Sequence, residues 1–176
     1  MSDASWAKLM VLVDGSTACV KISGRANFTS SVDFKTLINE LHQNGSNCFI
    51  LDLTDCVLMD STFLGVLAGF AVKMSGGNGY GKGGRIELFN PNTRITDILE
   101  SLGVLHLFHI TKTPSVKMDT TRAFKSESVN ATKQEVTRTC LEAHKTLMDL
   151  NPENVARFKD VTQFMAEDLK KMKSGS

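Results

Sequence analysis

The chain has 176 residues, of which 41% are hydrophobic and 22% charged, and its formal net charge is +1. These proportions are typical of a globular protein and exclude a disordered or fibrous chain. Nucleic acid binding is not expected, because basic residues cluster only at 170–173 and form no stripe that would neutralise phosphates. No stretch reaches the roughly 20 apolar residues that cross a bilayer, and the N-terminus lacks a secretory signal pattern. We therefore expect a cytoplasmic protein without a membrane segment.

Cysteines and histidines show no spacing typical of a metal site. The four cysteines contain no CxxC pair, so we expect buried, reduced thiols. The four histidines have no ligand spacing with the cysteines or with one another. No Ser-His-Asp order indicates a nucleophile with its base. The sequence therefore predicts no metal, no cofactor and no enzymatic activity.

The first half of the chain alternates apolar strands with amphipathic helices. Residues 7–13 and 18–22 predict a hairpin around the turn Asp14-Gly15-Ser16. Helical spacing predicts a helix over 32–43, and the nearly continuous apolar run 48–53 predicts a strand covered on both faces. Residues 54–59 are expected to be a loop, and a second helix is expected from Ser61.

The same alternation continues to residue 110. A strand is predicted at 85–89, a helix after Asn90-Pro91-Asn92, and a last short strand at 105–110. Strands that alternate with helices at this spacing predict βαβ units, and therefore an α/β fold with a mixed or parallel sheet. The glycine-rich turn at 76–84 is not a phosphate-binding loop, because it follows a helix and precedes a strand.

The composition changes after residue 110. Residues 111–131 are polar and predict a linker, and residues 132–176 predict a helical hairpin. The first helix carries a narrow apolar seam, and Asn151-Pro152-Glu153 restarts the chain as a second helix. Two interpretations stay open. The hairpin either covers the sheet of its own chain, or it forms a homodimer contact or docks a partner.

Asp60-Ser61-Thr62 is the segment best placed to act as a switch. It lies between a predicted buried strand and a predicted helix, with Asp60 at the N-cap and Ser61 at the first helical position. A phosphate on such a hydroxyl is compatible with the positive end of the helix, yet repels Asp60 and an acidic partner surface. The alternative is that these residues only cap the helix.

The segment Met59-Asp60-Ser61-Thr62-Phe63-Leu64-Gly65 resembles the signature of the STAS family (sulfate transporter and anti-sigma-factor antagonist). Residues 23–27, 51–53, 83–84 and 101–104 resemble the motifs that surround this signature, in the same order. The resemblance covers residues 6–110. It implies a STAS-like mixed sheet at 1–110 with helices packed on it, followed here by the linker 111–131 and the helical hairpin 132–176.

The resemblance to the antagonist branch implies roles for five residues. Ser61 matches the phosphoacceptor, Thr62 is a second, less favoured acceptor, and Asp60 matches the acidic residue beside it. Asn27 stands where the family usually has Asp, which removes a charge near the hydroxyl. Phe63 replaces a Gly, and it either extends an apolar contact toward a partner or hinders a kinase. These five residues are the expected partner-binding face.

The implied function is that of an anti-sigma factor antagonist in transcription regulation. The expected partners are an anti-sigma factor with serine kinase activity, which phosphorylates Ser61, and a serine phosphatase, which reverses the modification. The alternative is a scaffold or sensor subunit of a larger signalling assembly that is not phosphorylated.

Overall fold

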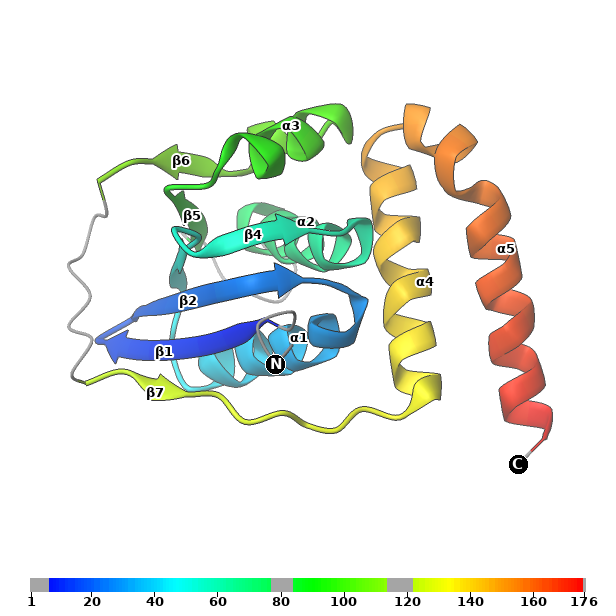
Figure 1. Ribbon diagram of the computed structural model, residues 1–176, viewed down its shortest axis with the longest axis horizontal. Helices are drawn as coiled ribbons and strands as arrows, with labels where there is room; N and C mark the ends of the chain where they lie inside the picture. Colours follow the sequence, from blue (N-terminus) through cyan, green and yellow to red (C-terminus); the bar gives the residue numbers. More distant parts are fainter. Residues whose placement is uncertain (1–6, 77–83, 114–121, 176) are drawn as a thin grey trace.

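The computed structural model describes residues 7–76, 84–113 and 122–175 (Figure 1). Its strands are β1 (Lys8–Asp14), β2 (Thr17–Ala26), β3 (Cys48–Asp52), β4 (Cys56–Met59), β5 (Arg85–Phe89), β6 (His109–Thr111) and β7 (Phe124–Lys125). Its helices are α1 (Phe28–Gln43), α2 (Ser61–Gly76), α3 (Thr93–Ser101), α4 (Lys133–Leu150) and α5 (Glu153–Ser174), with a short 3₁₀ turn η2 (Leu105–Leu107). Most of these elements coincide with the predicted segments, although α1 begins earlier than expected because Asn27 caps it.

The strands form one mixed sheet in the order β6-β5-β3-β2-β1-β7. β1 and β2 are the predicted antiparallel hairpin, whereas β2, β3, β5 and β6 run parallel to one another. β7 pairs antiparallel with β1, so part of the segment expected to be a linker belongs to the edge of the sheet. The predicted α/β class with a mixed sheet and a C-terminal helical hairpin is confirmed.

The prediction of a loop over residues 54–59 is wrong, because β4 lies within it. β4 pairs in parallel with the last residues of β2, from Gly24 to Ala26. The connecting turn is tight, since Cys56 N–H donates to the Leu53 carbonyl at 3.1 Å and Gly24 N–H donates to the Asp55 carbonyl at 2.9 Å. This pairing fixes where the chain enters α2.

The predicted strand at 105–110 is also corrected. Its first residues form η2, and only its last residues belong to β6, which pairs with the end of β5. The left-handed Gly103, with φ of +73°, ends α3 and turns the chain into η2, so little length remains for a strand.

The main core lies between one face of the sheet and helices α1 and α2. Its fully buried side chains include Phe34 of α1, Phe63 of α2 and Phe49 of β3. A smaller apolar cluster, formed by Leu12, Cys19 and Ile50, occupies the opposite face. The alternation of these residues along the strands explains the nearly continuous apolar runs in the sequence.

The C-terminal helices pack on their own chain. In Figure 1, α4 (yellow to orange) stands across the end of α2, and α5 (orange to red) runs back along α4. Leu147 of α4 is fully buried in the main core. The helices approach closely at Gly65, where an added Cβ would lie 2.5 Å from the carbonyl oxygen of Ala143. The hairpin therefore packs on its own chain, as in the first interpretation, but it covers helices α1 and α2 and not the sheet.

The glycine-rich turn at 76–84 lies largely outside the described residues. Among the helices of the described chain, none combines the length and apolar character needed to span a bilayer.

Candidate functional site

Asp60 joins the N-terminal ends of α1 and α2. Its Oδ1 accepts a hydrogen bond from Phe63 N–H at 2.9 Å, which caps α2. Its Oδ2 accepts from Phe28 N–H, the first residue of α1, at 2.7 Å. The parallel pairing of β2 with β4 makes this possible, because it brings the two strand ends, and the helices that follow them, to one edge of the sheet. Asp60 N–H itself donates to the Ala26 carbonyl at 3.0 Å.

Burial raises the pKa of the Asp60 carboxyl above its ordinary value of 3.8. The hydrogen bonds from Phe63 and Phe28 favour the charged form and oppose this rise. The carboxylate is thus partly desolvated, and a further negative charge beside it would be poorly screened.

Asn27 caps α1 on the same edge. Its Oδ1 accepts from Thr29 N–H at 3.1 Å, and Asn27 N–H donates to the Ser30 hydroxyl at 3.2 Å, which together form a capping box. The amide therefore serves the helix end, and no hydrogen bond links Asn27 directly to Ser61 among those found in the described chain.

The Ser61 hydroxyl bonds to a histidine of the C-terminal hairpin. Ser61 Oγ lies 2.9 Å from His144 Nε2, and His144 Nδ1 lies 2.7 Å from the Cys140 carbonyl oxygen. A carbonyl only accepts, so Nδ1 carries a proton and donates to Cys140. In the imidazole tautomer with its single proton on Nδ1, Nε2 accepts from the Ser61 hydroxyl. The ring is 5% exposed, and Phe158 of α5 packs edge-on against it with centroids 4.8 Å apart.

Thr62 and Phe63 are buried beside this hydrogen bond. Thr62 is 4% exposed and faces Cys140 of α4, whose thiol pKa is raised by burial. Phe63 is fully buried, and its ring centroid lies 4.7 Å from that of Phe34. In this conformation Phe63 therefore supports the site from the core and does not present its ring to the surface.

An apolar groove of about 420 Å³ borders the site. The STAS-like part of the chain contributes Phe28 and Thr62 to its wall, and the hairpin contributes residues of α4 and α5, among them Cys140 and Phe164. Phe28 is 47% exposed and Phe164 is 68% exposed, so the groove has an open apolar rim.

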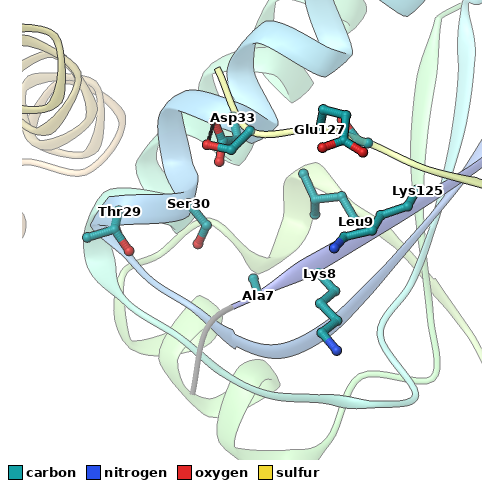
Figure 2. Close-up of a pocket in the computed structure, with 10 residues that line it drawn as sticks. Ala7, Lys8, Leu9, Thr29, Ser30, Asp33, Lys125 and Glu127 are labelled. Atoms are coloured by element: carbon teal, nitrogen blue, oxygen red, sulfur yellow. Dashed lines mark hydrogen bonds between the residues drawn. The ribbon is translucent and has the colours of Figure 1, made fainter. Parts of the chain in front are cut away.

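A second cavity, of about 560 Å³, lies on the other side of the first turn of α1. Figure 2 shows that Thr29, Ser30 and Asp33 of α1 surround it together with residues of β1 and of the chain around β7. Its walls mix charges of both signs, and Asp33 is already engaged, since it accepts from Val129 N–H at 2.9 Å. The switch residues Asp60, Ser61 and Thr62 do not line it.

The site can hold a hydroxyl in a polarised state beside a desolvated carboxylate. A serine hydroxyl that donates to an oriented imidazole resembles a nucleophile with its base. However, the Phe63 N–H at the start of α2 already donates to Asp60, so it is not available to stabilise a reacting group. Neither cavity described above is lined by Ser61 or His144. In the described residues no group of three or more His, Cys, Asp or Glu side chains is arranged to hold a metal ion.

Comparisons with known proteins agree with this fold. The family model of the STAS domain matches residues 8–116, and the chain belongs to the STAS family. The structure is similar to that of the anti-sigma factor antagonist SpoIIAA in its unphosphorylated form, with 16% identity, a TM-score of 0.51, and coverage of 60% of this chain and 89% of SpoIIAA. It is also similar to an anti-sigma factor antagonist from Mycobacterium paratuberculosis, with 16% identity, a TM-score of 0.53, and coverage of 64% and 92%. A search of curated proteins finds no match.

The resemblance to the STAS family is thereby confirmed, whereas His144 was not anticipated. Ser61 and His144 are 83 positions apart, and no local pattern connects them. One signal pointed to a close helix contact, because Gly65 and Gly69 lie four residues apart on one face of α2 and leave room for another backbone. It does not say which helix fills that room.

Proposed function

We propose that this protein is a regulatory protein of the anti-sigma factor antagonist type. It binds an anti-sigma factor through the edge where α1 and α2 begin, and Asp60, Ser61 and Thr62 form the centre of that face. The observation that carries the proposal is the Asp60 carboxylate, which accepts from Phe28 of α1 and from Phe63 of α2. The STAS family membership and the shared fold with two antagonists support the proposal.

Phosphorylation of Ser61 controls this binding. The kinase activity of the partner transfers the γ-phosphoryl group of ATP to Ser61 Oγ, ADP leaves, and the hydroxyl proton is released. A serine phosphatase hydrolyses the ester and restores the hydroxyl. The phosphate adds negative charge beside the partly desolvated Asp60 carboxylate. The two negative groups together repel an acidic partner surface. The cap of α2 remains, because the start of a helix tolerates negative charge. Ser61 is favoured over Thr62 because Thr62 is 4% exposed.

Asn27 and Phe63 hold in place the two helix ends that form the face. Asn27 holds the first turn of α1 in place through its capping box. Phe63 fixes the first turn of α2 through its contact with Phe34. We assign both residues a positioning role at the partner-binding face of a cytoplasmic regulator of transcription.

The test is a pull-down from the native host with the wild-type chain, Ser61→Asp and Ser61→Asn. The two variants have the same shape and differ in charge. An anti-sigma factor that binds wild type and Ser61→Asn, but not Ser61→Asp, supports the proposal. That protein is then incubated with ATP and the wild-type chain, and the phosphate is mapped by mass spectrometry. A bound kinase that leaves both Ser61 and Thr62 unmodified would refute control by phosphorylation.

A second function is a scaffold or sensor subunit that is not phosphorylated. The hydrogen bond from Ser61 to the buried His144 favours it, because the hydroxyl is engaged within the protein. Assembly would then use the exposed apolar side chains of α5, namely Val155, Val161 and Phe164, which are 43%, 37% and 68% exposed. Light scattering of wild type and Phe164→Glu distinguishes the two functions. A homodimer that the substitution dissociates supports assembly through the C-terminal helices, whereas two monomers of equal mass argue against it.

A further inference from the structure

Helix α4 covers the residues proposed to bind the partner. His144 lies on Ser61, with Oγ and Nε2 2.9 Å apart, and Ala143 lies on Gly65 one turn further along α2. At the rim of the same contact, Lys35 of α1 pairs with Glu142 of α4 at 3.1 Å. The start of α2 is thus occupied by a helix of the same chain.

A phosphate on Ser61 is incompatible with the hydrogen bond to His144. The ester replaces the proton that the hydroxyl donates, so the contact of 2.9 Å between Ser61 Oγ and His144 Nε2 loses its hydrogen bond. The ring cannot turn away easily, because the Cys140 carbonyl holds Nδ1 and the Phe158 ring packs against its edge. An added charge would also lie next to the desolvated Asp60 carboxylate. Modification of Ser61 and the closed position of α4 therefore oppose each other.

The two ends of the hairpin are held differently. At the corner between α4 and α5, Asn154 Nδ2 donates to the Leu102 carbonyl at 2.9 Å and to the Leu147 carbonyl at 2.8 Å, and Asn154 is fully buried. Arg157 adds a bond to Ser101 at 3.1 Å. The opposite end, where α4 begins and α5 ends, instead borders the open apolar groove of about 420 Å³. The hairpin is thus anchored by hydrogen bonds at its corner, whereas the opposite end of its two helices borders open space.

We propose that α4 masks the switch in cis, and that negative charge on Ser61 loosens the arms of the hairpin while its corner stays attached to α3. The proposal rests on the proposed function, because covering this face regulates binding only if the face binds a partner. In the closed state the hydroxyl and the start of α2 are withheld from a partner or kinase. In the open state both are accessible, so the partner binds the unmodified chain only while the hairpin is open. A phosphate on Ser61 then repels that partner and also keeps α4 from closing. Binding and modification of this face are then both coupled to the position of α4.

The test measures how fast Cys140 reacts with a thiol reagent in the full-length chain. Cys140 is 7% exposed and lies on the covering face of α4, whereas Cys56 is 2% exposed and belongs to the main core. Ser61→Asp is compared with Ser61→Asn by labelling with 5,5′-dithiobis(2-nitrobenzoate) at pH 8 and mapping the labelled peptides. Cys140 should react at least about tenfold faster in Ser61→Asp, because labelling of a buried thiol follows the population of the open state. Cys56 should react at the same rate in both variants.

A reversible lock provides the second variant. A Cβ on residue 69 would lie 3.8 Å from Thr146 Cγ2, so Gly69→Cys with Thr146→Cys places two cysteine side chains side by side between α2 and α4. Formation of their disulfide is verified by mass spectrometry before labelling. Added to Ser61→Asp, the oxidised pair should return Cys140 to its slow rate, and reduction should restore the fast rate. Equal rates for Ser61→Asp and Ser61→Asn would overturn the proposal. Equal acceleration of Cys140 and Cys56 would overturn it too, because the hairpin would then be inseparable from the core. This assay uses no partner and no kinase, so it can succeed even if the proposed function fails.

Discussion

Replacing Gly65 by alanine tests whether α4 rests on α2 as described. In an exposed helix interior, Gly→Ala stabilises a protein by about 1 kcal/mol, because alanine loses less backbone entropy on folding. Here the new Cβ would lie 2.5 Å from the Ala143 carbonyl oxygen and 2.8 Å from its carbonyl carbon. Backbone atoms cannot rotate away, so α4 has to shift, and overpacking of this kind costs about 1–3 kcal/mol. We therefore expect Gly65→Ala to lower the free energy of unfolding by about 1–2 kcal/mol.

The matched control is Gly69→Ala on the same face of α2. A Cβ at residue 69 would lie 3.8 Å from Thr146 Cγ2, which is an ordinary contact. This substitution should raise the free energy of unfolding by about 0.5–1 kcal/mol. Urea unfolding followed by far-UV circular dichroism measures both changes. If Gly65→Ala stabilises the chain as much as Gly69→Ala does, α4 is not seated on α2 in solution.

A double variant sharpens the same test. Adding Ala143→Gly to Gly65→Ala removes the Ala143 side chain, whose Cβ would lie 2.7 Å from the new methyl group. The nearest atom, the carbonyl oxygen, remains. The double variant should therefore recover little of the lost stability, whereas full recovery would mean that side chains, and not backbones, set the distance between the helices.

Two further predictions concern the switch residues. Burial raises the pKa of Asp60 in the folded protein above its unfolded value of 3.8. Between these two pKa values the native state binds more protons than the unfolded state. The free energy of unfolding of the wild type therefore decreases as the pH rises through this window. The free energy of unfolding of Asp60→Asn, measured relative to wild type, should therefore increase with pH across this window and level off above it; a relative stability that falls with pH would contradict the assigned cause. Phe63 is fully buried against Phe34, so Phe63→Ala should lower the free energy of unfolding by about 3–5 kcal/mol in urea unfolding, and a loss below about 1 kcal/mol would place its ring outside the core.

Local pattern was sufficient for most of the fold and for the cap of α2. A nearly continuous apolar run indicated β3, because strands buried on both faces have few polar positions. The short strand-like run at 85–89 indicated β5. Helical spacing indicated α2, α4 and α5. The place of Asp60 at the start of α2 followed from its position between a strand and a helix, since capping depends on neighbours along the chain.

Contacts between distant segments were beyond the reach of such patterns. β4 has four residues, and it is a strand because the end of β2 is available beside it. The apolar seam of α4 indicated that one face of this helix is buried, but it did not indicate that this face packs against Gly65 of α2. The second hydrogen bond of Asp60, to Phe28, depends on the register between β2 and β4. These features depend on tertiary packing, which a repeating pattern along one element does not encode.

The outer strands of the sheet limit how this protein can meet others. β6 has three residues and β7 has two, so each of these two outermost strands of the described sheet offers only a short stretch of backbone to another chain. A long open edge would invite an added strand from another chain, and with it aggregation. Strand addition needs such an edge to supply its main-chain hydrogen bonds. Within the described residues, the helices and the turns between them therefore offer a partner more than the two outermost strands do, and their side chains can discriminate one partner from another.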